Sequence, residues 1–221
     1  MAYIFQKERI LIRNRVADFI SRFSIKGRVL DLGAGDVLRY KDLFKQADQY
    51  LTQDHREAAN YKHDFVCDAS RVPTPDASFD VIICTQVLEH VPNPFLVMEE
   101  AARLLRPGGR LILTVPQTNE IHEAPYDFFR YTKYGIMEMS KKCGLKVEEI
   151  HGLGDFWTMR VKEAQRFWIE CLNLYSHPIP AKLFSVCFRM CYGLAEWSDN
   201  HLVPDRLQGR FTIGWAALLS K

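Results

Sequence analysis

The chain has 221 residues, of which 48% are hydrophobic and 25% are charged, and this size and composition suit one α/β domain with an ample core. A formal net charge of +2 is too small to indicate nucleic acid or another polyanion as a partner. The six cysteines form no CxxC pair and no Cys/His cluster with metal-ligand spacing. These features favour a reduced, cytoplasmic protein without a metal site.

Residues 1–26 are expected to form an N-terminal helix, because apolar residues recur at helical spacing between positions 12 and 23. Charged residues interrupt the first 18 positions, so this segment is not a secretory signal. No stretch approaches the ~20 apolar residues that span a bilayer.

Residues 27–150 alternate between strand and helix patterns. Proline and glycines at 107–109 are expected to stop the helix before them. Strands separated by helices imply a parallel sheet with right-handed crossovers, whose ligand crevice lies beyond the carboxyl ends of the strands. The expected strands are 28–32, 50–54, 63–67, 79–84, 110–115 and 145–150, with a last strand at 211–219, and the expected helices are 37–46, 94–105 and 132–142.

A glycine turn, Gly33-Ala34-Gly35, follows the first of these strands. Such a turn lets backbone approach a ligand closely. A dinucleotide-binding turn would place a third glycine at position 38, where this chain has Leu38. Asp31, just before the turn, would repel a pyrophosphate and attract a cation such as a sulfonium with an α-ammonium group.

Two more carboxylates end the second and third strands. Asp54 lies 19 positions beyond Gly35, where a carboxylate accepts hydrogen bonds from both ribose hydroxyls of a nucleoside. Asp68 is placed to accept from an adenine amine, and the alternative is a helix cap or turn former. Three acidic residues at consecutive strand ends together favour a cationic adenosyl ligand.

Three segments follow one another in the order Val29-Leu-Asp-Leu-Gly-Ala-Gly-Asp36, Ser78-Phe-Asp-Val-Ile-Ile-Cys-Thr-Gln-Val-Leu-Glu-His-Val-Pro92 and Leu104-Leu-Arg-Pro-Gly-Gly-Arg-Leu-Ile-Leu-Thr-Val-Pro116. Together they resemble the motifs of class I S-adenosylmethionine-dependent methyltransferases, in the group that includes ubiquinone-biosynthesis enzymes. The resemblance covers about residues 27–150, the cofactor-binding core. It implies a Rossmann-like α/β fold with a seven-stranded, mostly parallel sheet and an antiparallel last strand within 210–221.

The resemblance also implies S-adenosylmethionine as cofactor, S-adenosylhomocysteine as product, and a role for each site residue. Asp31 and the turn of Gly33, Ala34 and Gly35 would hold the methionine end. Asp54 would bind ribose with His55 beside the adenine, Asp68 and Ala69 would read the adenine edge, and Thr85 and Gln86 would lie near the methyl group.

Two histidines are candidate bases for an acceptor hydroxyl. His90 follows the fourth strand in a Glu-His pair, and helix-end structure or enclosure of the cofactor is an equal alternative. His122 begins a loop, 122–132, that concentrates polar and aromatic residues over the crevice. The expected substrate-binding residues on this loop are Tyr126, Asp127, Arg130 and Tyr131, although Asp127 and Arg130 could instead form a structural ion pair.

The loop is similar to one in methyltransferases associated with bacterial polysaccharide and cell-surface glycan synthesis. This similarity implies a sugar or glycan-precursor hydroxyl as the acceptor. Two alternatives stay open: C- or N-methylation in quinone or secondary metabolism, and a catalytically silent cofactor-binding subunit. No carboxylate and Asn cluster for Mg²⁺ and no base-amine motif of nucleic-acid enzymes is evident, so no metal and no nucleic acid are expected.

Residues 155–209 form a helical insertion before the last strand of a single domain that covers 1–221. An aromatic helix is expected at 161–175, and after a break at 177–180 a nearly all-apolar helix at 181–197. Such a helix must be buried or meet a partner. It is interpreted as a lid, with a homodimer contact or a peripheral membrane contact at the inner membrane face as alternatives.

Overall fold

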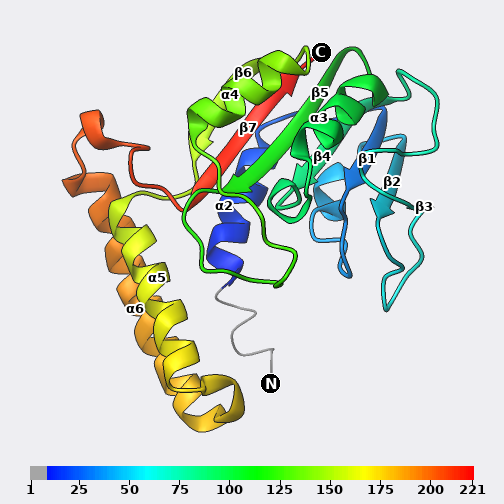
Figure 1. The fold of residues 1–221 in the computed structure, drawn as a ribbon. Helices are drawn as coiled ribbons and strands as arrows, with labels where there is room; N and C mark the ends of the chain where they lie inside the picture. The colour runs from blue at the N-terminus through cyan, green and yellow to red at the C-terminus, as the bar shows by residue number, and fades with distance from the viewer. Residues whose placement is uncertain (1–8) are drawn as a thin grey trace.

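The structure is a computed structural model that describes residues 9–221, and the part of the expected N-terminal helix at residues 1–8 lies outside the described residues. Within the described chain, seven strands form one sheet in the order β3-β2-β1-β4-β5-β7-β6 (Figure 1). β7 runs antiparallel to both β5 and β6, whereas the other pairs are parallel. The fold class is therefore confirmed. The strands are β1 (Arg28–Leu32), β2 (Gln49–Asp54), β3 (Phe65–Val66), β4 (Phe79–Thr85), β5 (Leu105–Pro116), β6 (Lys146–Gly152) and β7 (Gly214–Ser220).

Helices cover both faces of this sheet, as Figure 1 shows. On one face, α3 (Pro94–Leu104) and α4 (Lys133–Lys142) bury apolar side chains in the larger core cluster. On the other face, α2 (Arg9–Ser21) packs against the sheet in a second cluster. The strands β1, β4 and β7 are buried from both sides, which explains their largely apolar sequences.

The first half of the sheet contains less helix than the sequence predicts. The expected helix at 37–46 is a single 3-10 turn, η1 (Lys41–Phe44), which no side chain caps and which buries Phe44. No α-helix joins β2 to β3 or β3 to β4 in this fully described region. β3 is shorter than expected because the carboxylate of Asp64 takes the Thr52 N–H at 2.8 Å, in place of a longer ladder.

The strand β5 begins five residues earlier than expected and runs through the Pro-Gly-Gly segment at 107–109. Its pairing with β4 shifts register there, because Phe79 pairs with Leu105 while Val81 pairs with Arg110. The helix before it ends at Leu104, one residue before the expected end. The irregular residues thus lie at the start of the strand, away from the carboxyl edge that carries the site.

The insertion is an antiparallel pair of long helices, α5 (Phe156–Cys171) and α6 (Pro178–Leu202), which projects from the sheet (Figure 1). α5 starts earlier than expected because the Asp199 carboxylate accepts hydrogen bonds from the Trp157 and Thr158 N–H groups at 2.8 and 3.1 Å. The expected break at 177–180 instead begins α6, since proline is tolerated in the first turn of a helix. Short 3-10 segments η2 (Leu88–His90), η3 (Leu174–Ser176) and η4 (Asp205–Leu207) complete the fold.

Candidate functional site

The candidate site lies where the strand order reverses, at the carboxyl ends of β1 and β4. The glycine turn follows β1, and Gly33 and Gly35 have φ angles of +76° and +69°, which favour glycine. A Cβ added at Gly33 would lie 2.4 Å from Cγ2 of Val87, which follows β4. The two strand ends are therefore in close contact.

The glycine turn is held by the end of β2. The N–H groups of Gly33 and Ala34 donate to the Gln53 carbonyl at 3.0 and 2.9 Å. The Gly35 N–H donates to Oδ2 of Asp54 at 2.9 Å. The predicted turn and the predicted ribose-binding carboxylate are thus brought together, and His55 is adjacent, with its Nδ1 2.8 Å from Asp54 Oδ1.

Asp31 is buried beneath the turn, and the Tyr50 hydroxyl donates a hydrogen bond to it. Burial raises the pKa of Asp31 to about 6, against the opposing effects of Tyr50 and Arg39. A carboxylate in such surroundings is stabilised by a nearby cation. Its position is therefore compatible with electrostatic attraction of a cationic ligand from below the turn.

The remaining predicted cofactor residues lie around the same edge. Oδ1 of Asp68 accepts from both the N–H and the hydroxyl of Ser70, at 2.8 and 2.7 Å, so Asp68 forms the turn that was its alternative interpretation. Ala69 is buried in the core cluster beside it. Thr85 ends β4, and Gln86 has a φ of 56° and donates from Nε2 to the Thr114 hydroxyl at 3.3 Å.

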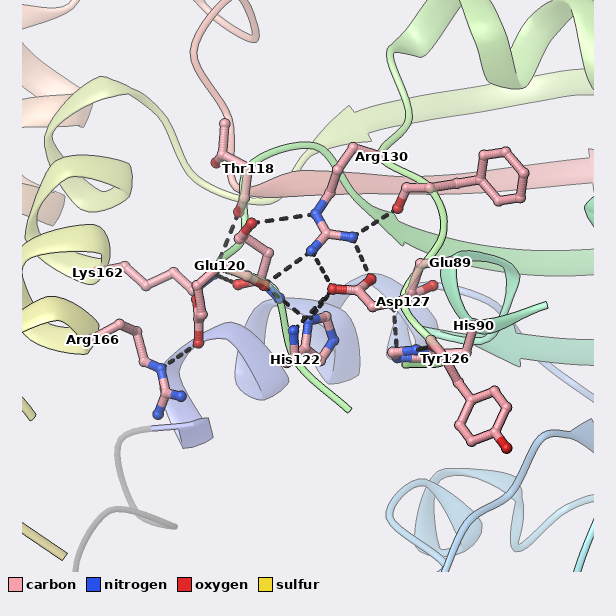
Figure 2. A network of polar contacts seen from close by, with 12 residues as sticks. Glu89, His90, Thr118, Glu120, His122, Tyr126, Asp127, Arg130, Lys162 and Arg166 are labelled. Atoms are coloured by element: carbon pink, nitrogen blue, oxygen red, sulfur yellow. Dashed lines mark hydrogen bonds and ion pairs between the residues drawn. The ribbon is translucent and has the colours of Figure 1, made fainter. Parts of the chain in front are cut away.

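On the acceptor side, Asp127 organises the loop after β5 (Figure 2). Its carboxylate is 1% exposed and pairs with Arg130 through two hydrogen bonds of 2.6 and 2.7 Å. It also accepts the His122 N–H at 2.9 Å. The hydrogen bonds from Arg130 hold the pKa of Asp127 well below its usual range. Asp127 and Arg130 therefore form the structural ion pair and position His122.

The two aromatic residues predicted to bind substrate lie in different surroundings. Tyr131 is buried in the core cluster, and its hydroxyl donates to the Leu88 carbonyl at 2.8 Å. Tyr126 is 66% exposed on the loop. Tyr126 is thus accessible from solvent, while the Tyr131 hydroxyl links the loop to the residues after β4.

The two candidate bases lie side by side, with His90 and His122 ring centroids 4.8 Å apart in an edge-to-face arrangement. His90 Nδ1 is 2.6 Å from the Tyr126 carbonyl, and His122 Nδ1 is 3.1 Å from the Glu120 carbonyl. The sequence places them 32 positions apart, on two different loops.

Beside them lies Glu89, a residue whose importance the sequence analysis missed. Its side chain is fully buried, and burial raises its pKa to about 8. Its two carboxylate oxygens accept no hydrogen bond from the described residues. In the sequence only the Glu89-His90 pair drew attention to Glu89, and the pair does not indicate that the Glu89 side chain is buried.

Two cations of α5 were also missed. Lys162 donates to the Thr118 carbonyl at 3.4 Å and to the Asn119 side chain, and Arg166 pairs with Glu120 (Figure 2). Burial lowers the pKa of Lys162 to about 8. These contacts join the insertion to the loop that carries His122, across more than 40 positions of sequence that no local pattern connects.

Residues 30–113 match a family model described as "Methyltransferase domain". Over these residues the chain is similar to a methyltransferase domain. The match begins in β1 and ends in β5, so the matched region contains the glycine turn and all three carboxylates of the cofactor edge.

Among curated relatives, a 27-O-demethylrifamycin SV methyltransferase of Amycolatopsis mediterranei is 54% identical over 117 residues, which is 45% of this chain and 42% of the relative. A ubiquinone biosynthesis O-methyltransferase of Coxiella burnetii is 30% identical over 111 residues, 44% of this chain and 47% of the relative. The chain therefore spans less than half the length of these relatives.

A solved structure of Burkholderia thailandensis 1,6-didemethyltoxoflavin-N1-methyltransferase, with bound 1,6-didemethyltoxoflavin and S-adenosylhomocysteine, shares the fold. The alignment covers 96% of this chain and 78% of that chain, with a TM-score of 0.60 and 14% identity. The predicted fold class is confirmed, and the matches to methyltransferases support the predicted family and S-adenosylmethionine as its cofactor.

Proposed function

We propose that this chain transfers a methyl group from S-adenosylmethionine to a hydroxyl of a small-molecule acceptor and releases S-adenosylhomocysteine. The observation that carries the proposal is the hydrogen bond from Gly35 to Asp54, which places a carboxylate and an open glycine turn side by side at the switch point. A Cβ added at Gly35 would have no neighbour within 4 Å, so the turn is open to a ligand.

Each carboxylate takes a different part of the cofactor in this proposal. Asp54, with His55, binds the ribose and adenine side, since its Oδ2 already aligns with the turn. Asp31 attracts the cationic methionine end from beneath. Asp68 uses one carboxylate oxygen in its own turn, which leaves the other for the adenine amine.

An oxygen acceptor is supported by the names of two curated relatives, a 27-O-demethylrifamycin SV methyltransferase and a ubiquinone biosynthesis O-methyltransferase. A hydroxyl of a quinone or secondary-metabolite precursor is therefore the first class to test. The sugar or glycan-precursor hydroxyl rests on the 122–132 loop. C- or N-methylation is the further alternative.

Isothermal calorimetry with S-adenosylmethionine and S-adenosylhomocysteine tests the cofactor site. Asp54→Asn should weaken both ligands at least tenfold, because the ribose hydroxyls lose a charged acceptor. Asp76→Asn, which removes an exposed carboxylate paired with Arg103, is the matched control and should bind normally. No binding to the wild-type chain would refute the proposal.

A methyl-release screen then separates the acceptor classes. It would compare hydroquinones, polyketide phenols and nucleotide sugars, with S-adenosylhomocysteine formation as the readout. Release with one class identifies the acceptor. Cofactor binding without release in any arm would favour the silent cofactor-binding subunit.

We propose that His90 and His122 activate the acceptor hydroxyl, because they lie together beside the exposed Tyr126 on the acceptor loop. His122→Ala should reduce turnover at least a hundredfold while cofactor affinity stays unchanged. His151→Ala, an exposed histidine on β6, is the control. Undiminished turnover in His122→Ala would exclude His122 from catalysis.

The α5–α6 pair acts as a lid in this proposal, within one domain made by residues 1–221. Lys162 and Arg166 attach α5 to the acceptor loop, so movement of the pair would move the loop. All six cysteines lie in the described chain and are free, which supports a reducing, cytoplasmic location.

The outer face of α6 is proposed to bind a second copy of the chain. Six apolar side chains, 43% to 83% exposed, recur on this face at intervals of three or four residues. Such a stripe suits helix–helix packing between two copies. The stripe comprises Ile179, Leu183, Val186, Met190, Leu194 and Trp197.

Sedimentation velocity tests the stripe. Leu183→Glu and Leu194→Glu should convert a dimer to a monomer, whereas Leu96→Glu, an exposed leucine on α3, should not. In the described residues no helix has the length and apolarity to cross a bilayer. A monomeric wild-type chain that floats with liposomes would instead favour the peripheral membrane contact.

A further inference from the structure

We propose that Glu89, His90 and His122 bind one divalent transition-metal ion, with Zn²⁺ as the probe. One ligand atom from each of the three residues lies within 4.8 Å of the others. Two imidazoles and one carboxylate are a recurring ligand set for catalytic Zn²⁺ and non-haem Fe²⁺.

The hydrogen bonds of the two histidines orient them as ligands. Each Nδ1 faces an oxygen that can only accept, namely the carbonyls of Tyr126 and Glu120, so each Nδ1 carries the proton. In the neutral rings Nε2 is then an unprotonated donor atom. Metal-bound histidines almost always have such a partner on the other ring nitrogen.

Glu89 supplies the independent observation. It is fully buried, and both oxygens lack a hydrogen-bond partner among the described residues. His90 Nε2 lies 3.9 Å from Glu89 Oε1, too far for a hydrogen bond. A buried carboxylate is costly unless it is paired or coordinates a metal.

The nearby cation is already committed elsewhere. Arg130 makes its two short hydrogen bonds to Asp127. No described residue donates a hydrogen bond to either Glu89 oxygen, and the Nδ1 atoms of both histidines already face carbonyls. Zn–N and Zn–O bonds are about 2.0–2.2 Å, so the ligand atoms need to approach by roughly 1 Å to close a site.

The role of the ion rests on the proposed function. The side chains of His90 and His122 are 19% and 22% exposed, so one side of the cluster is open to an acceptor. An acceptor hydroxyl bound to the ion would lose its proton to water. Its oxygen then forms the new bond to the methyl carbon as the carbon–sulfur bond breaks, and the bonding electron pair stays on sulfur.

Calorimetry with ZnCl₂ on the full chain, without cofactor or acceptor, tests the site. The expected result is one ion per chain, with affinity lowered at least tenfold in His122→Ala and in Glu89→Gln. The matched control is His151→Ala, because His151 and Glu149 form an exposed Glu–His pair 3.0 Å apart with no third ligand among residues 9–221. His122→Ala removes a partly exposed side chain, so it keeps the test valid if Glu89→Gln fails to fold.

Visible absorption of the Co²⁺-loaded chain gives a second readout. Intense d–d bands that disappear in His122→Ala would support coordination by the cluster. No Zn²⁺ binding by the wild-type chain, or equal loss in His122→Ala and His151→Ala, would overturn the proposal. If Zn²⁺ does not bind but His122→Ala still abolishes turnover, the histidines act as bases and the methyltransferase proposal stands.

Discussion

Gly33 and Gly35 have similar backbone conformations but different surroundings. Alanine substitutions at these two positions therefore separate the energetic cost of a positive φ angle from the cost of steric overlap with a neighbour. Both have φ near +70°, where an alanine costs about 1–2 kcal/mol relative to its normal conformation. A Cβ at Gly35 would meet nothing within 4 Å, whereas one at Gly33 would lie 2.4 Å from Cγ2 of Val87. Carbon atoms pack at about 3.5–4.0 Å, so Val87 would need to move by about 1 Å.

Gly35→Ala is therefore expected to lower the free energy of unfolding by about 1–2 kcal/mol. Gly33→Ala should lower it by a further 1–3 kcal/mol or so, because overpacking adds to the backbone cost. Val87→Ala removes the overlapping methyl groups, so it should recover roughly 1–2 kcal/mol in combination with Gly33→Ala. The same substitution should recover nothing with Gly35→Ala.

Urea unfolding followed by circular dichroism measures all five variants, and calorimetry measures their cofactor affinity. Gly35→Ala should lose affinity for S-adenosylmethionine out of proportion to its small loss of stability, because its methyl group enters the open side of the turn. Equal destabilisation at both glycines, or no coupling between Gly33 and Val87, would refute the packing of the β1 and β4 ends described here.

Three further predictions concern buried charge. Because the pKa of Asp31 is raised from 3.8 to about 6, cofactor affinity should fall as pH drops below about 6. Its ionisation should also cost roughly 3 kcal/mol of stability as pH rises from about 4 to 6, and urea titrations of Asp31→Asn should lack that slope. Arg130→Leu leaves the Asp127 carboxylate buried and unpaired, and should lower the free energy of unfolding by about 3–5 kcal/mol. The double variant with Asp127→Leu should recover most of this loss, and urea unfolding measures both variants. The pKa of Lys162 is about 8 in the folded chain and 10.5 in the unfolded chain, so between these pH values the unfolded chain binds more protons. The free energy of unfolding of the wild type should therefore rise over that window by up to roughly 3 kcal/mol. Thermal scans at pH 7.5 and 9.5 should show this rise for the wild type and not for Lys162→Met.

The cofactor edge could be predicted from sequence because its residues are close in the chain or at regular strand ends. The glycine turn, Asp31 and Asp54 need only the strand periods and the rule that parallel strands present their carboxyl ends together. The antiparallel last strand was implied by the family resemblance, and its position is confirmed.

The acceptor side could not be predicted to the same depth, because it depends on contacts between distant loops. Nothing in the spacing of His90 and His122 shows that their rings meet, or that Glu89 is buried beside them. The ion pair of Asp127 and Arg130 was an open alternative, since the same spacing suits a substrate clamp. In place of the expected helix at 37–46 the chain forms a short 3-10 turn, and both Tyr40 and Phe44 are buried there.

The place of β7 in the sheet has a consequence for synthesis of the chain. β6 pairs with β7 and β7 pairs with β5, so a strand made after α5 and α6 joins two strands that are made before them. During translation, the edges of β5 and β6 that pair with β7 stay unpaired while the ribosome synthesises α5 and α6. During that interval two strand edges lack their partner, and unpaired edges can pair with other chains.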